Sequence, residues 1–147
     1  MTHPLTAADF NMLFRGTTYG AHDIFTPRSF AEFVSHHQID LDRAVTRYED
    51  GDLLGALAFG IREDRAWFAL IGVREDQRRS GVGKTLVAEA IARVRAAGVR
   101  RIELETVQRN AAAANMMLER GFSIAGELAV WTRGARKRAQ TPPSPRA

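Results

Sequence analysis

The first third of the chain carries apolar residues at helical spacing and then at strand spacing. Between residues 5 and 33, Leu and Phe recur at loosely helical intervals, with breaks at residues 16–20 and at Pro27. This pattern predicts two short helices. Further on, AVTRY is β-prone, Asp50-Gly51 is a strong hairpin turn and LLGALAFGI is a largely apolar segment. We therefore expect an antiparallel strand pair after the two helices.

The middle of the chain predicts a strand, a loop, a helix and a second strand. After a turn at Asp64 and Arg65, AWFALIGV is apolar on both faces, as in a central strand of a covered sheet. The polar stretch REDQRRSGVGK leads into an apolar stripe over residues 82–94, which Glu89 and Arg93 support and Gly98 ends. RIELETV then alternates as a strand, which completes a βαβ unit.

The last part of the chain predicts one more helix, from about Asn110 to Arg120, stopped by Gly121. FSIAGELAVWT reads as a final strand or short hairpin, and residues 133–147 as a basic, proline-containing, disordered tail. The predicted fold class is α/β (α+β). A single domain over residues 1–132 would hold a mixed central sheet flanked by helices, with a β-hairpin followed by the βαβ unit.

Composition narrows the functional classes. The chain has 147 residues, 45% hydrophobic and 26% charged, which indicates one folded domain with a core. It has no cysteine, which excludes disulfides, thiolate metal sites and a cysteine nucleophile. Five of the 21 basic residues lie in the tail, which leaves 16 bases against 17 acids elsewhere. This balance argues against a broad nucleic-acid-binding face.

The expected location is the cytoplasm, with no membrane partner. No apolar run approaches the ~20 residues needed to cross a bilayer. The N-terminal sequence MTHPLTAADF also lacks a charged start followed by an apolar signal core.

The segment with the clearest chemistry is RRSGVGK, residues 78–84, between the apolar strand and the amphipathic helix. Glycines allow close backbone approach, and helix N-terminal amides are donors suited to phosphate oxygens. A nucleotide-binding P-loop would need glycine where Arg78 stands, and a GxGxxG fingerprint starting at Gly81 fails at Leu86. A glycine-rich turn with solvated arginines remains the alternative.

These residues fit the pattern R-x-x-G-x-G/A, and the sequence resembles the GNAT superfamily of acetyl-CoA-dependent acyltransferases. The resemblance covers roughly residues 43–131: a strand ending IGV, the loop RRSGVG, LETVQRN on the next strand and a helix closing with ERGF. The order and spacing of these pieces carry the resemblance. It implies the GNAT fold and an acyltransferase that uses acetyl-CoA as cosubstrate and no metal.

The resemblance also implies a cofactor site. The pyrophosphate would lie on the backbone amides of residues 79–84, and the pantetheine arm would pair with the end of the central strand. Asn110 would contact the arm, although a helix N-cap explains an asparagine there equally well. The implied cofactor-binding residues are Ile71, Gly72, Val73, Arg78, Arg79, Ser80, Gly81, Val82, Gly83, Lys84 and Asn110.

Without cysteine, direct attack of an amine on the thioester is the economical mechanism. Glu105 resembles the catalytic glutamate of bacterial N-terminal acetyltransferases that act on ribosomal proteins; the alternative is a strand glutamate paired with an arginine such as Arg101 or Arg109. Glu103 is the second candidate base. Met117 stands where many family members place a proton-donating tyrosine, and Trp67 near the position of another family glutamate.

His36, His37, Asp40 and Asp42 could be read as a metal cluster, but they lack HExxH-type spacing. We expect a surface helix end there and no metal site. Since the family builds its acceptor surface in this region, the same residues could face a cationic amine.

We therefore predict an N-acetyltransferase that transfers the acetyl group directly to a primary amine: a protein N-terminus, a lysine or a small molecule. The alternatives are a non-catalytic acyl-CoA-binding module and, in third place, a nucleic-acid-binding protein that uses the basic tail. About ten residues separate Phe122 from the tail, whereas the family ends in a longer hairpin. The last strand would then be short, or a second copy of the chain would complete the sheet in a homodimer. The third alternative is that the chain is the first part of a longer protein.

Overall fold

The computed structural model describes residues 4–16, 23–104 and 111–122. The chain divides into two compact units, residues 1–111 and 112–147, which are considered separately. The first unit holds α1 (Ala7–Leu13), α2 (Pro27–His36), the 3-10 turn η1 (Leu41–Arg43), β1 (Val45–Glu49), β2 (Asp52–Arg62), β3 (Arg65–Val73), the 3-10 turn η2 (Glu75–Gln77), α3 (Val82–Ala96) and β4 (Arg101–Leu104). Helix α4 (Ala111–Glu119) begins at the boundary and belongs otherwise to the second unit.

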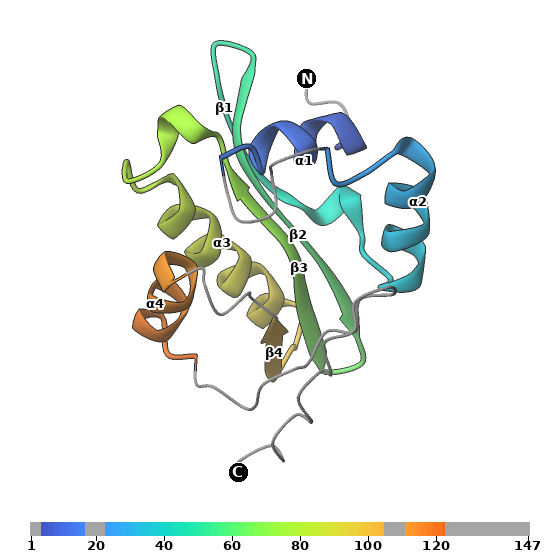
Figure 1. Cartoon of the computed structure of the whole chain (residues 1–147). Coiled ribbons are helices and arrows are strands. Elements are labelled where there is room, and N and C mark those ends of the chain that lie inside the picture. The colour runs from blue at the N-terminus through green and yellow to red at the C-terminus, as the bar shows by residue number, and fades with distance from the viewer. Residues whose placement is uncertain (1–3, 17–22, 105–110, 123–147) are drawn as a thin grey trace, which may run out of the picture. The chain divides into compact units, whose positions relative to one another are not determined.

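The first unit is built on a four-stranded mixed sheet in the order β1-β2-β3-β4 (Figure 1). Strand β2 pairs antiparallel with β1 and β3, and β3 pairs parallel with β4. Asp50 and Gly51 both have positive φ, at 50° and 85°, as the predicted two-residue hairpin requires. The α/β fold class, the hairpin and the βαβ unit β3–α3–β4 are confirmed.

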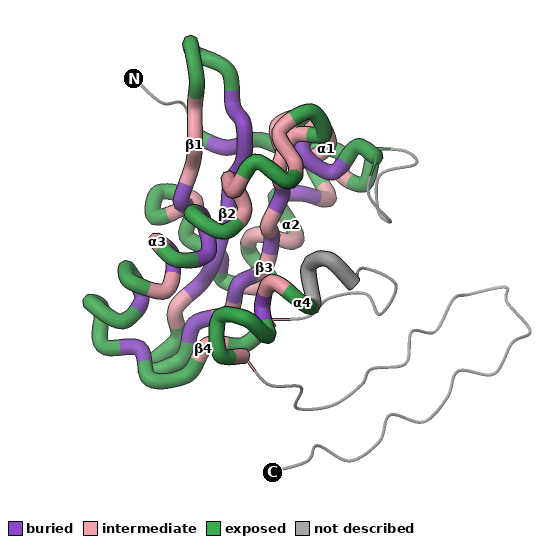
Figure 2. The backbone as a smooth tube through the Cα atoms, turned by 90° about the vertical axis from the view of Figure 1, so that its left-hand side faces the viewer, coloured by how far each residue is buried: buried purple, intermediate pink, exposed green. Residues whose placement is uncertain are grey.

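Helices cover both faces of this sheet. Figure 2 shows α3 on one side of the strands and α1 with α2 on the other. The two glycines that face the helices allow close packing: a Cβ on Gly72 would lie 2.8 Å from the Cβ of Leu13 in α1. A Cβ on Gly55 would lie 3.0 Å from a methyl carbon of Leu86 in α3. The sheet is therefore covered on both sides, as the doubly apolar sequence of β3 predicts.

The two N-terminal helices begin where their capping residues stand. Thr6 with Asp9, and Thr26 with Ser29, form reciprocal capping boxes, and Pro27 occupies the first turn of α2. Between the helices, the side chain of Asn11 donates to the carbonyl of Phe25 at 2.8 Å and accepts from two backbone amides. The predicted pair of short helices is confirmed. Their aromatic residues form the core against β2 and β3, with ring contacts among Phe10, Phe14, Phe25, Phe30 and Phe33.

Helices α3 and α4 both end at glycines that the sequence indicates. Gly98 and Gly121 have φ of 87° and 93°. In α3 the amides of Gly98 and Val99 donate to Arg95 and Val94, and α4 ends with the same pattern of bonds. This is the Schellman arrangement. The final strand predicted in FSIAGELAVWT and the tail over 133–147 lie outside the described residues. Among the helices that are described, none is long and apolar enough to cross a bilayer.

Tyr48 offers a test of the packing between β1 and α1. Its hydroxyl is buried and has no hydrogen-bond partner among the described residues. Burial, and secondly the charge of Asp9, raise the pKa of this phenol above 10.0. We expect Tyr48→Phe to leave the free energy of unfolding at pH 8 unchanged or to raise it by up to about 1 kcal/mol, because no bond is lost. Urea denaturation followed by circular dichroism measures this.

The pH dependence supplies the control. Above pH 10 the phenol ionises in the unfolded chain before it ionises in the folded one, so the folded state holds more protons and the wild type loses stability as pH rises. The Tyr48→Phe variant should lack this component of the loss between pH 8 and pH 10.5. A variant that is less stable than the wild type at pH 8 would show that the hydroxyl has a partner.

Candidate active site

The candidate site is built around the loop between β3 and α3, residues 74–81. Arg79 and Gly81 in this loop have positive φ, at 65° and 92°, and Gly81 is the N-cap of α3. Gly81 has no side chain with which to cap the helix, and Val82, Gly83 and Lys84 form its first turn. The first amides of a helix have no carbonyl partner within it, and they carry the positive end of its dipole. The loop therefore presents a backbone site suited to an anion.

Arg78, the first residue of the sequence motif, holds this loop in place. Its guanidinium donates to the carbonyl oxygens of Val73 at the end of β3, of Leu13 at the end of α1 (both at 3.2 Å) and of Arg15. These three bonds join the loop between β3 and α3 to the end of β3, to the end of α1 and to the segment that follows α1. From the sequence, Arg78 is expected among the cofactor-binding residues, whereas in the structure its guanidinium is bonded to backbone carbonyls.

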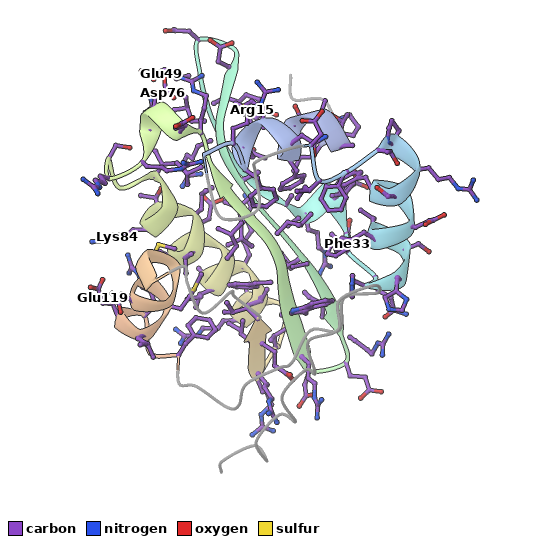
Figure 3. All side chains as sticks on the ribbon, viewed as in Figure 1. Arg15, Phe33, Glu49, Asp76, Lys84 and Glu119 are labelled. Carbon is purple, nitrogen blue, oxygen red and sulfur yellow. The ribbon has the colours of Figure 1, made fainter. Side chains whose placement is uncertain are left out.

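Two further side chains shape the loop. Arg74 makes a two-point contact with Asp76, at 2.6 and 3.0 Å, and this hydrogen bond is the main cause that lowers the pKa of the Asp76 carboxyl. The Ser80 hydroxyl donates to the carbonyl of Gln77. Arg79 and Lys84 are exposed on the loop and on the first turn of α3. In Figure 3 Lys84 points away from the sheet, while Asp76 lies at the far end of the loop.

The three predicted strand residues, Ile71, Gly72 and Val73, form the end of β3 and lead directly into this loop. They pair with Leu57, Ala56 and Gly55 of β2. On the other side of β3, the described pairs with β4 run only from Arg65–Arg101 to Phe68–Leu104. Within the described part of the chain, the backbone groups of Ile71 to Val73 that point away from β2 are therefore not bonded to β4. Residues 105–110, which follow β4, lie outside the described residues.

Of the two candidate bases, only Glu103 lies within the described residues. Glu103, the second candidate, is paired with Arg65 at 3.6 Å and with Arg101 at 3.4 Å. Both guanidinium groups therefore compete with a substrate amine for the lone pairs of this carboxylate. Glu105 and Asn110 lie outside the described residues. Of the two arginines considered as partners of Glu105, Arg101 contacts Glu103, and Arg109 lies outside the described residues.

A second feature, which the sequence reasoning missed, is an open cavity of about 540 Å³ beside the start of β3. Its wall is made by the end of α2, the end of β2, the start of β3 and the end of β4, and includes His36, His37, Gln38, Arg62, Arg65, Trp67 and Glu103. The His37 and Trp67 rings meet edge to face, 4.1 Å between centroids. Tryptophan has an apolar ring and a polar N–H group, so Trp67 on a strand is a sequence signal that could have indicated the cavity.

The residues considered for a metal have other roles. His37 packs between the rings of Phe33 and Trp67, at 4.4 and 4.1 Å, and the Asp40 carboxylate accepts from the amide of Asp42 to cap η1. No group of three metal-ligating side chains occurs among the residues that the structure describes.

Comparison with known proteins gives a consistent result. Residues 10–122 match the family model of the acetyltransferase (GNAT) family. No curated protein gives a significant match. Among solved structures, a candidate GNAT acetyltransferase from Desulfovibrio desulfuricans is 27% identical, with 72% of this chain and 73% of that chain covered and a TM-score of 0.55.

Two more distant structures share the fold. The PaiA N-acetyltransferase from Thermoplasma acidophilum, solved in complex with coenzyme A, is 16% identical over 84% of this chain and 91% of its own, with a TM-score of 0.64. The ribosomal-protein-S18-alanine N-acetyltransferase from Escherichia coli is 22% identical over 84% and 77%, with a TM-score of 0.65.

Proposed function

The chain belongs to the acetyltransferase (GNAT) family, and we propose that it transfers the acetyl group of acetyl-CoA directly to a primary amine. The observation that carries this proposal is the unit β3–loop–α3, in which a strand end leads into a helix whose N-cap, Gly81, has no side chain. The presence of coenzyme A in a protein of the same fold supports it.

The proposed cofactor site follows the chain from β3 into α3. The pyrophosphate is bound by the amides of residues 79–84, with Arg79 and Lys84 supplying positive charge. The pantetheine arm lies along Ile71, Gly72 and Val73, whose outward backbone groups pair with it as with an added strand. Arg78 acts as a positioning residue, because its three bonds to carbonyls fix the loop against β3 and α1.

The proposed chemistry is direct transfer. Glu105 accepts a proton from the acceptor amine, the amine nitrogen forms a bond to the thioester carbonyl carbon, and the bond from that carbon to sulfur breaks. Backbone amides at the end of β3 stabilise the oxygen as it gains charge. Met117 has no proton to give, so the thiolate leaves as the anion or takes its proton from water.

The rival proposal is a non-catalytic acyl-CoA-binding module. The pairing of Glu103 with two arginines favours it, because these arginines compete with a substrate for the second candidate base. Calorimetric titration with acetyl-CoA tests the shared part of both proposals, and we expect micromolar binding. Acetylation of a panel of amines and peptides by the same sample separates them. A folded protein that does not bind acetyl-CoA would contradict both.

Replacing the proposed base should separate binding from turnover. We expect Glu105→Gln to lower kcat by about 100-fold, because an amide cannot take the amine proton. The dissociation constant for acetyl-CoA should be unchanged. Steady-state kinetics over pH 6–9 with the best amine of the panel measures the effect.

The matched control is Glu119→Gln, which makes the same change at an exposed residue near the end of α4. It should leave kcat at the wild-type value. A Glu105→Gln variant that retains full kcat and an unchanged pH profile would exclude Glu105 as the base.

A further inference from the structure

The charge and the shape of the cavity beside the start of β3 indicate which class of acceptor the protein binds. All of its described lining residues belong to the first unit, and they include the end of α2, which Figure 2 shows on the side of the strands opposite α3. Trp67 in its wall is four residues before Ile71 on the same strand, which places it roughly 13 Å away at ~3.3 Å per residue. An extended peptide covers that distance with about four residues.

Positive charge predominates around the cavity. Glu103 is shared between Arg65 and Arg101, so its single negative charge is already balanced. The Arg62 guanidinium donates to the side-chain oxygen of Gln38 at 2.8 Å, which is a neutral partner. Two guanidinium groups, those of Arg62 and Arg65, thus line the cavity with one carboxylate, and Arg101 from outside the lining also pairs with that carboxylate. A site of this kind attracts an anionic group and repels a cation.

The part of the cavity wall that Trp67 forms is held in place by aromatic contacts. The His37 ring contacts Trp67 at 4.1 Å and Phe33 at 4.4 Å, so three rings brace one another. Trp67 is only partly buried and lines the cavity. A partly exposed tryptophan flanked by arginines can pack against the apolar stem of an acidic side chain while the arginines bind its carboxylate.

We propose that this cavity binds the acidic segment of a peptide acceptor, with carboxylates three to four residues from the amine that is acetylated. The assignment rests on the proposed function, which places the reacting amine near the end of β3. A small amino acid is too short to reach both places. A polyamine or a lysine-rich peptide has the wrong charge for Arg62 and Arg65.

The test uses the fluorescence of Trp67. The chain has two tryptophans, so Trp131→Phe leaves Trp67 as the single emitter. This protein is titrated, without acetyl-CoA, with the peptides AAAEEA and AAAKKA, which differ only in having two Glu or two Lys residues. We expect saturable quenching by AAAEEA at sub-millimolar concentration, weakened at high salt, and none by AAAKKA. Equal or tighter binding of AAAKKA, or no binding of either peptide, would overturn the proposal.

A charge variant tests the named arginines. Arg62→Gln with Arg65→Gln should raise the dissociation constant of AAAEEA by about tenfold. Arg95→Gln is the matched control, because Arg95 is exposed on α3, on the opposite face of the sheet, and should leave the constant unchanged. Circular dichroism verifies that each variant is folded. Equal affinities of the two variants would refute the role of the arginines.

Calorimetry with acetyl-CoA on the same protein keeps the two proposals apart. Acetyl-CoA binding without binding of AAAEEA refutes only the assignment of the cavity. Binding of AAAEEA without any acetyl transfer refutes the proposed function and leaves the cavity as an acidic-peptide site.

Discussion

Gly81→Asp is expected to weaken acetyl-CoA binding by about 100-fold relative to Gly81→Asn. Gly81 is the N-cap of α3, and a Cβ there would meet nothing within 4 Å, so the side chain would extend into the space proposed for the pyrophosphate. One negative charge about 5 Å from another costs roughly 3 kcal/mol at an effective dielectric constant of 20. Calorimetric titration of both variants with acetyl-CoA measures the difference.

The comparison with asparagine removes two other effects. Both side chains are the same size, and both bear the strain of φ at 92°, which asparagine and aspartate tolerate better than most residues. Gly98→Asp is a further control, since Gly98 has φ of 87° and open space at the other end of α3. It should retain wild-type affinity. Equal loss in Gly81→Asp and Gly81→Asn would mean that backbone strain, and not charge, disturbs the site.

Local signals account for most of the fold that could be predicted. The turn at Asp50-Gly51, the end of α3 at Gly98 and the end of α4 at Gly121 each depend on a few adjacent residues, and all lie where the sequence indicates. The apolar sequence of β3 likewise indicates, without any distant contact, that both of its faces are covered. The order of strands follows from the hairpin and the βαβ unit, whose connections permit few topologies.

The part of the candidate site that is formed by the backbone could be predicted from the sequence. Residues 78–84 form the loop and helix start that an anion site requires, and this follows from glycines between a strand and a helix. The partners of Arg78 could not be predicted, because Leu13 and Arg15 are more than 60 positions away in sequence. For the same reason the cavity was missed: it joins α2, β2, β3 and β4, and none of these segments indicates it alone.

The end of α2 shows how a distant contact can determine such a cavity. Gln38 follows the helix in the left-handed region, at φ of 53°, where glycine is usual. The amide of Asp40 donates to the carbonyl of Phe59 at 3.1 Å, which fastens this turn to β2. The next residue of β2 is Gly60, whose missing side chain leaves room for the backbone of Gln38. Close approach of two backbones therefore forms one wall of the cavity.

Gly60→Ala should consequently destabilise the protein by about 3 kcal/mol. Its Cβ would overlap the carbonyl oxygen of Gln38 and lie 3.0 Å from the carbonyl carbon, and backbone atoms cannot move aside as the end of a side chain does. Overpacking a well-filled interior typically costs ~1–3 kcal/mol, and a clash with backbone belongs at the upper end. Urea denaturation followed by circular dichroism measures the change in midpoint at constant m-value.

Gly55→Ala is the matched control, because it adds the same methyl group to the same strand. There the nearest atoms are a methyl carbon of Leu86 at 3.0 Å, the carbonyl oxygen of Gly72 at 3.1 Å and a methyl carbon of Val82 at 3.1 Å. Two of the three can move by side-chain rotation, so we expect a cost of about 1 kcal/mol. Since only Gly60 borders the cavity, its variant should also lose affinity for AAAEEA while Gly55→Ala retains it. Equal stability losses in the two variants would show that the backbone of Gln38 can shift away from β2, and that the end of α2 is not fixed by this contact.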